Sequence, residues 1–442
     1  MAAQGTRHRR SVKGRVWAGV SLAAAAGLAV TATLSMSAEA AWTSTWNVSA
    51  SGWIGSDSPQ VAVDRQGDSL LAWTACDQAT SGCYFRVQTR VKTASGTTGA
   101  IRTLSPDGAA PNWPEVASDD TGDSAVVWQQ DGHVVGRRVA ASGALVGPLQ
   151  RLSTSGPASN PVVAVTPGGT AMAAWTEIRD GSEYAVARRL MIDGTLGAPI
   201  TLGSAHGEKA AIGVDRSGRF VVAWVRGGSE VVARRISSTT VGATKVLTSS
   251  IASYAGFGAV RVGVDRDGDA VITYHSGGGD RAQQWASRWS RTGTLSAPLR
   301  ISASTDNVGF AHALATDLEG DSMIVWNRLN SGRSELLGRR LSAAGTRGAV
   351  VALGPGDRPD LAVDDDGDGM LVFHTVVPTS TIPYSYTKTT ARTFTRSGGW
   401  GTAKTLTSDG RVPQVGSRPT ARFTVIWQRE ASPYTIRSVT GP

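Results

Sequence analysis

Cysteine, histidine and the common catalytic motifs are scarce in this 442-residue sequence. It has two cysteines and six histidines, so a catalytic metal would have few ligands to draw on. The patterns G-x-S-x-G, H-E-x-x-H and the Walker loop are all absent. No apolar run after the first forty residues is long enough to span a membrane. The sequence therefore does not match the enzymes that these motifs define.

The first forty residues have the three regions of a secretory signal. A basic stretch is followed by an apolar one and then by the small-residue pattern AEA that ends at Ala40. This order predicts a signal peptide over residues 1–40, cut before Ala41, with a membrane anchor as the alternative. The pair Arg9 and Arg10 resembles a twin-arginine signal, so the Sec and twin-arginine routes both stay open. We expect a secreted, extracellular protein with no membrane span after cleavage.

Much of the positive charge belongs to this leader. The formal net charge is +9, and residues 1–40 contain five Lys or Arg and one Glu, so the remainder carries +5. Such a charge on a large protein is weak grounds for nucleic-acid binding, which we do not expect. It is compatible with loose attraction to anionic cell-wall polymers.

The two cysteines, Cys76 and Cys83, stand close together in ACDQATSGCY. In an exported chain this spacing favours one local disulfide, and two free thiols are the alternative.

An internal repeat of about fifty residues fills the rest of the chain. Each copy is anchored on a large aromatic residue, and the anchors are Trp73, Trp128, Trp175, Trp224, Tyr274, Trp326, Phe373 and Trp427. An Asp nine residues before the anchor and a Gly six before it form a D-x-x-G signature, complete in six of the eight copies. Eleven residues before the anchor, every copy has Ala or Gly. This register excludes chance and indicates one architectural unit repeated eight times.

Each copy reads as four short strands. PQVAV, at Pro59, precedes a tight DRQG turn in which Asp caps and Gly supplies the positive φ. LLAWT is apolar on both faces, which indicates a strand buried on both faces. Two further strands follow, and four antiparallel strands per unit are typical of a β-propeller blade. The invariant small residue fits the crowding of innermost strands near a central axis.

The ends of the chain set the number of blades. The last copy stops after three strands, and the segment before the first copy resembles a fourth strand. We therefore predict an all-β fold with a single domain over residues 41–442. It is an eight-bladed β-propeller closed by the N-terminal strand, with seven blades and an irregular tail as the alternative.

The sequence resembles secreted bacterial β-propeller repeat proteins in general, over essentially all of residues 41–442. The closure resembles that of tryptophan-aspartate repeat propellers, although the Gly-His and Trp-Asp pairs of that family are absent. The D-x-x-G turn resembles the Asp-box of sialidases, but it joins the first two strands rather than the last two. No sialidase arginine triad can be placed, so the resemblance implies the fold and no specific chemistry.

Two recurrent charged features have structural explanations. The third strand carries an Arg in most copies, from which we expect stacking on a neighbouring Trp or a repeated salt bridge. The turns DRDGDA and DDDGDG resemble integrin-type calcium loops but are shorter, and capped hairpin turns explain them equally. We therefore expect no cofactor and no metal site, and calcium has six candidate ligands: Asp265, Asp267, Asp269, Asp364, Asp366 and Asp368.

Function is expected where the repeat is broken. We define the loop face as the face that bears the connections between blades and the hairpins between second and third strands. Thirteen residues before the anchor, at the channel mouth on this face, the side chains are variable and partly charged. Solvated strand ends are the alternative explanation. With aromatic and His residues of the same face, the predicted ligand-binding residues are Gln60, Glu115, Arg261, Asp360, Gln414, Trp53, Trp113, His275 and His374.

These features favour a binding or scaffolding module at the cell surface that recognises carbohydrate, cell-wall polymer or protein, and we expect a monomer. The alternative is a secreted glycan-active hydrolase or lyase with Glu115 and Asp360 as catalytic carboxylates. Those two acids lie three blades apart, which we expect to be too far for a retaining pair. A purely structural ring is the third possibility. The sequence leans away from catalysis without deciding it.

Overall fold

The computed structural model describes residues 41–50, 55–77, 84–249, 260–276, 282–330, 332–378, 385–419, 422–431 and 434–442. The predicted signal peptide, residues 1–40, lies outside this part of the chain, and its cleavage stays a prediction. None of the described residues forms a helix with the length and hydropathy needed to cross a membrane.

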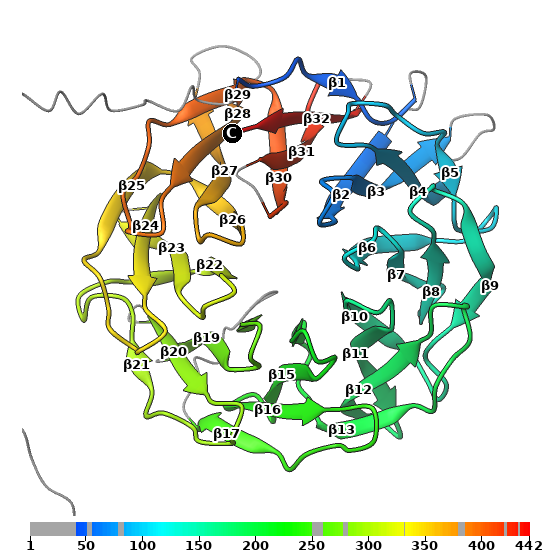
Figure 1. The fold of residues 1–442 in the computed structure, drawn as a ribbon, viewed down its shortest axis with the longest axis horizontal. Coiled ribbons are helices and arrows are strands. Elements are labelled where there is room, and N and C mark those ends of the chain that lie inside the picture. Colours follow the sequence, from blue (N-terminus) through cyan, green and yellow to red (C-terminus); the bar gives the residue numbers. More distant parts are fainter. Residues whose placement is uncertain are drawn as a thin grey trace, which may run out of the picture. The chain divides into compact units, whose positions relative to one another are not determined.

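The described part of residues 41–442 forms eight four-stranded antiparallel sheets arranged as a ring, which confirms the predicted eight-bladed propeller (Figure 1). The strands of blades 1 to 4 are β2 (Gly55–Val63), β3 (Ser69–Asp77), β4 (Tyr84–Lys92), β5 (Arg102–Thr103), β6 (Pro111–Ser118), β7 (Ser124–Gln130), β8 (His133–Val139), β9 (Leu145–Arg151), β10 (Ala158–Val165), β11 (Ala171–Arg179), β12 (Ser182–Leu190), β13 (Ile200–Ser204), β14 (Ala211–Val214), β15 (Phe220–Arg226), β16 (Glu230–Ile236) and β17 (Lys245–Thr248). Those of blades 5 to 8 are β18 (Val260–Val264), β19 (Ala270–Ser276), β20 (Gln283–Trp289), β21 (Leu299–Arg300), β22 (Val308–Thr316), β23 (Ser322–Asn330), β24 (Arg333–Leu341), β25 (Val351–Pro355), β26 (Asp357–Val363), β27 (Gly369–Pro378), β28 (Ser385–Phe394), β29 (Lys404–Thr407), β30 (Gly410–Ser417), β31 (Phe423–Arg429), β32 (Ile436–Gly441) and β1 (Trp46–Asn47). Within each blade the first strand is innermost.

Blade 8 takes its outermost strand from the other end of the chain, as predicted. The sheet order is β1-β32-β31-β30, and in Figure 1 the blue β1 lies beside the red β32. Thr43 N donates to Thr440 O and Val48 N donates to Ile436 O, both at 2.9 Å. Val48 is fully buried in a cluster with Trp73 of blade 1, so the closure joins backbone pairing to core packing.

The D-x-x-G turns are capped as expected, and they also join the blades. Asp317 Oδ1, for example, accepts the backbone N–H of Asp321 at 2.8 Å, and Gly320 has φ +89°. A Cβ added to Gly320 would lie 2.8 Å from Asp265 Oδ2 of the preceding blade. The same contact recurs at Gly122, Gly268 and Gly367 with the Asp of the blade before each. Glycine is required at this position by its dihedral angle and by the approach of the neighbouring carboxylate.

The aromatic anchors form the core, and the small column lies where neighbouring blades converge. All eight anchors are buried, the most exposed being Phe373 at 4%. A Cβ on Gly263, in the small column, would lie 2.0 Å from Thr316 Oγ1 and 3.5 Å from Leu314 Cδ2 of the next blade. The taper of the ring therefore demands Ala or Gly here because the next blade's larger side chains occupy the space.

The recurrent third-strand arginine lies over a neighbouring Trp in two blades, as predicted, and also makes contacts that were not predicted. Arg90 lies 5.5 Å from the centre of the Trp46 ring, and Arg392 lies 5.6 Å from that of Trp400. Arg188 Nε donates to Gly197 O of its own blade at 2.7 Å, and Nη1 donates to Leu152 O of the preceding blade at 3.0 Å. Arg339 repeats this with Gly348 O and Ile301 O, both at 2.7 Å. These arginines connect adjacent blades through backbone carbonyl groups rather than through salt bridges.

Candidate functional site

A backbone irregularity precedes the channel mouth in most blades. The pairing of first and second strands shifts register just before the mouth column, for example between Asn112 and Glu115 and between Asp357 and Asp360. In five blades a residue other than glycine adopts positive φ there, between 47° and 55°: Ser58, Trp113, Asn160, Arg358 and Val412. Such bulges redirect side chains, and strained backbone of this kind is concentrated at functional positions.

Four charged side chains interact at the loop-face end of the channel. Glu115 of β6 forms an ion pair with Lys209, which lies just before β14, two blades further round the ring. The charges of Asp360 and Glu115 both act on the guanidinium group of Arg261, which lies in β18. Asp360 Oδ2 accepts the backbone N–H of Val415, on the innermost strand of the next blade, at 2.8 Å. The structure therefore brings together three of the predicted site residues and adds Lys209.

The environment of Asp360 shifts its protonation. The pKa of this carboxyl is raised to about 6: burial and, to a smaller extent, the nearby charge of Glu115 raise it, whereas the Val415 N–H and the Arg261 charge oppose the shift. Glu115 thus acts electrostatically on Asp360 although the two are three blades apart around the ring. At mildly acidic pH this carboxyl can hold or release a proton.

A buried histidine pair lies behind Arg261. The rings of His275 (β19) and His312 (β22) have centroids 4.7 Å apart, and His312 Nε2 is 3.1 Å from Thr273 Oγ1. His275 Nε2 and His312 Nδ1 have no hydrogen-bond partner among the described residues. Burial lowers the pKa of His275 to about 4 and lowers that of His312 well below its usual value, and the Arg261 charge acts in the same direction on both.

The other predicted site residues lie in different surroundings. Trp113 is 48% exposed beside the mouth. Gln60 and Gln414 are half-buried, and Gln414 Nε2 donates to Pro413 O at 3.1 Å. His374 is buried opposite Asp357, behind the channel wall rather than at its surface. Trp53 lies outside the described residues.

Exposed apolar side chains also gather at the loop-face ends of the strands. Eleven large hydrophobic residues are exposed in the described part of the chain, and seven lie at this face. These seven are Phe85, Trp113, Ile178, Leu329, Val376, Tyr386 and Tyr434. Aromatic and apolar surface beside polar groups is the composition of many ligand sites.

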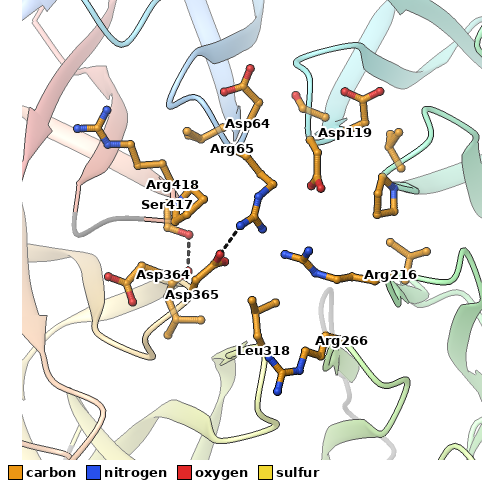
Figure 2. A pocket seen from close by; sticks show the side chains of 18 of the residues that line it. Asp64, Arg65, Asp119, Arg216, Arg266, Leu318, Asp364, Asp365, Ser417 and Arg418 are labelled. Atoms are coloured by element: carbon orange, nitrogen blue, oxygen red, sulfur yellow. Dashed lines mark hydrogen bonds and ion pairs between the residues drawn. The ribbon is translucent and has the colours of Figure 1, made fainter.

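Sequence reasoning missed a cavity at the other end of the channel. We define the turn face as the face that bears the D-x-x-G turns. A cavity of about 250 Å³ opens there, and Figure 2 shows Arg65 and Arg216 extending into it. Arg65 Nη2 pairs with Asp365 Oδ2 at 2.6 Å. The signal was available, because the column eight residues before the anchor varies among Arg, Asp, Pro and Leu.

Lys209 and His312 were also missed. Lys209 lies in the variable segment two residues before the mouth column. His312 stands fourteen residues before its anchor, where five of the eight copies have Pro, as in Pro59 and Pro114. Both residues would have been found if departures from the repeat had also been sought in the two columns that precede the mouth column.

The candidate calcium turns direct their carboxylates to separate partners. Asp265 Oδ1 accepts three backbone N–H groups of its own turn, and Asp269 Oδ1 accepts Arg291 N at 2.5 Å. Asp368 Oδ1 accepts Arg396 N at 2.8 Å. Among the described residues, no group of three or more acidic, His or Cys side chains is arranged to hold a metal ion. These carboxylates act as turn caps.

The disulfide prediction falls partly on residues outside the description. Cys76 is buried in β3, whereas Cys83 lies outside the described residues. The bond between them stays a prediction.

Comparison with known proteins found similar solved structures but no family. No family model matches the chain, and no curated protein matches its sequence. Similar solved structures include a prolyl endopeptidase (14% identity, TM-score 0.49), a PL25 ulvan lyase (10%, 0.49) and a protein of unknown function from Dyadobacter fermentans (11%, 0.48). They cover 86%, 89% and 91% of this chain, which covers 55%, 95% and 99% of theirs. The chain thus spans about half the length of the prolyl endopeptidase.

At such identities and scores the likeness carries no argument about activity. The chain's own topology defines its class: an eight-bladed β-propeller of four-stranded blades, closed by its N-terminal strand. Its function has to be argued from its own residues.

Proposed function

We propose that this protein is an exported binding module that recognises a polar polymer, carbohydrate in the first place, at the loop-face mouth of its channel. One observation carries the proposal. Charged side chains of the mouth column in blades 2, 5 and 7 interact, together with Lys209 of blade 4, where other blades have small or apolar residues such as Val162 and Ala313. A repeat that tolerates alanine at these positions does not need Glu115 or Arg261 for its architecture.

The chemistry of the mouth suits sugar hydroxyl groups. Lys209 and Arg261 supply donors, and Glu115 and Asp360 supply acceptors. Trp113, on the rim, offers an apolar face of the kind that packs against sugar rings. The exposed apolar residues of the loop face extend this surface beyond the channel, which also supports a protein ligand.

The proposal is tested by binding of the exported protein to an array of glycans and cell-wall polymers. The test variant combines Glu115→Gln, Arg261→Ala and Asp360→Asn; Asn keeps an acceptor for the Val415 N–H. We expect at least a tenfold loss of affinity with an unchanged melting temperature. Arg216→Ala, which changes an arginine at the opposite end of the channel, is the matched control and should bind as the wild type does. Equal binding by the triple variant would place the site elsewhere.

A glycan-active hydrolase or lyase is the second candidate, and the pKa of Asp360 favours it. A carboxyl with a pKa of about 6, under the influence of the charge of a second carboxylate, can serve as a general acid. Turnover of any polymer bound on the array is measured between pH 4 and 8 by the release of chain ends. Under this alternative, Asp360→Asn abolishes turnover and keeps affinity. Loss of affinity without any wild-type turnover leaves the binding module as the function.

A further inference from the structure

The seam between blade 8 and blade 1 departs from all the others in two repeat columns at once. Lys92 occupies the position of β4 that pairs with Ser69. The equivalent residues of the other blades are Val139, Leu190, Ile236, Trp289, Leu341, Phe394 and Gly441. On the other side of the seam, Arg418 replaces the Asp of the D-x-x-G turn, nine residues before Trp427. Lys92 and Arg418 each place a positive charge at a position where no other blade has one.

These two departures meet in one cavity of about 170 Å³. Lys92, Arg418 and Arg422 line it, together with hydroxyl groups of both blades. The hydroxyl-bearing lining residues are Thr43, Ser69, Thr93, Ser95, Thr424 and Thr440. None of the lining residues, all of them in the described part of the chain, carries a carboxylate.

The cations of the cavity are poorly compensated. Lys92 is 8% exposed; its Nζ donates to Thr440 Oγ1 at 3.2 Å and lies 5.2 Å from the centre of the Trp46 ring. Burial lowers the pKa of this ammonium group. Burial lowers the pKa of Arg418 as well, and the charge of Arg422 adds to the effect, so two guanidinium groups repel each other. Arg418 Nε is buried without a partner among the described residues.

Neighbouring carboxylates already have other partners. Asp68 Oδ1 accepts the backbone N–H of Ala94 at 2.7 Å, and Asp64 Oδ1 accepts that of Asp68 at 2.8 Å. Figure 2 shows Arg418 extending away from the centre of the turn-face cavity, which leaves its head group toward the seam. No carboxylate measurably shifts the pKa of Lys92 or Arg418, and none of the described residues that line the cavity carries one.

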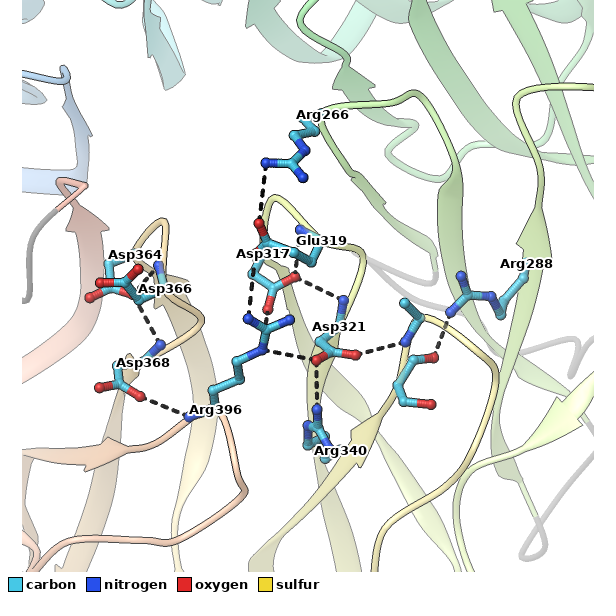
Figure 3. Close-up of polar contacts among 12 residues, drawn as sticks. Arg266, Arg288, Asp317, Glu319, Asp321, Arg340, Asp364, Asp366, Asp368 and Arg396 are labelled. Atoms are coloured by element: carbon cyan, nitrogen blue, oxygen red, sulfur yellow. Dashed lines mark hydrogen bonds and ion pairs between the residues drawn. The ribbon is translucent and has the colours of Figure 1, made fainter. Parts of the chain in front are cut away.

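The seam between blades 6 and 7 shows what full compensation looks like (Figure 3). There Arg396 lies 3.1 Å from Asp321 Oδ2, 3.7 Å from Asp317 Oδ2 and 3.7 Å from Glu319 Oε2. Arg340 pairs with the same Asp321 at 2.5 Å. With Arg266, which pairs with Glu319 at 3.3 Å, this cluster has three acids for three bases, whereas the cavity between blades 8 and 1 has three bases and no acid among its described lining residues.

We propose that the cavity between blades 8 and 1 binds a compact oxyanion: a sulfate, a phosphate or a carboxylate group. Charge-assisted hydrogen bonds from ammonium and guanidinium groups are the usual means of holding such groups. A volume of about 170 Å³ equals roughly five or six waters at about 30 Å³ each, enough for one tetrahedral oxyanion. The site lies at the closure of the ring, so its occupant also connects the two ends of the chain.

The test uses the exported protein and three probe ions, sulfate, phosphate and acetate, each titrated by calorimetry at constant ionic strength set with chloride. Lys92→Met keeps the length of the side chain and removes its charge, and Arg418→Thr restores the residue that blade 3 has at Thr166. We expect at least one probe to bind the wild type and raise its melting temperature above that in chloride. Each variant should lose at least tenfold in affinity for that probe.

Lys245→Met, on the outer strand of blade 4, is the matched control for loss of one positive charge and should bind the probe as the wild type does. Binding of none of the three ions by the wild type would overturn the proposal, and so would equal affinity in Lys92→Met. If Lys92→Met fails to fold, Arg418→Thr decides alone. The outcome is independent of the loop-face proposal, because the two sites share no residue.

Discussion

The buried His275 should make the fold sensitive to mild acid by an amount that can be worked out. Its folded-state pKa of about 4 lies below the reference value of 6.5. Between these two pH values the unfolded chain binds a proton at this histidine and the folded chain does not. His275 therefore does not lower the free energy of unfolding above pH 6.5, and it lowers this free energy progressively as the pH falls toward 4. Linkage gives a loss of about 2 kcal/mol between pH 7 and pH 5.

Asp360 acts in the opposite direction, so the pH dependence of the wild type alone is not diagnostic. Its raised pKa of about 6 means that the folded state binds a proton more tightly than the unfolded one. Its contribution is favourable at low pH and is lost as the pH rises through 6. The effect of His275 must therefore be isolated by comparing the wild type with a variant.

The informative variant is His275→Gln, because blades 2 and 8 have Gln129 and Gln428 at the equivalent position. Urea unfolding is measured at pH 7 and pH 5. The wild type should lose about 2 kcal/mol more than His275→Gln over this interval. Gln428→Asn changes packing without a titrating group and should shift stability equally at both pH values. Parallel losses in the wild type and His275→Gln would refute the reasoning.

Three further outcomes test the architecture. Deletion of residues 42–50 removes the outer strand of blade 8 and the buried Val48, and we expect aggregation or a melting temperature lower by many degrees; unchanged melting would contradict closure. Trp326→Ala empties a fully buried position and should lower the free energy of unfolding by roughly 3 to 5 kcal/mol in urea titrations, and a loss below 1 kcal/mol would argue against a packed core. Gly320→Ala meets both positive φ and the carboxylate of Asp265, so it should cost at least about 1 kcal/mol by the same measurement, and neutrality would show that the turn relaxes.

The ring could be predicted from sequence because its causes are local and repeated. The D-x-x-G turn, the apolar second strand and the buried anchor each follow from short-range rules, and eight copies remove the ambiguity of one. The contacts by which the Arg188 column connects adjacent blades were not predicted, because the partners are backbone carbonyl groups. Every residue has a carbonyl, so no pattern of side chains reveals such a contact.

The candidate site could be predicted only in part. The break in the mouth column identified Glu115, Arg261 and Asp360, which do interact. Their interaction across the channel, the part played by Lys209 and the burial of His275 depend on the radius of the ring and on side-chain direction. These are properties of the closed ring and are not encoded in any single copy.

The pairing of β1 with β32 also sets the order in which the molecule can be completed. Its partners Trp46 and Ser438 lie at opposite ends of the chain, so the first strand is made long before the strand that receives it. At translation rates of about 5 to 20 residues per second, the delay is roughly 20 to 80 seconds. During that time Trp46 and Val48 cannot enter the core that they occupy in the ring. Blade 8 is consequently the last to form, and a nascent or exported chain has to be kept from pairing its leading strand elsewhere until its final residues arrive.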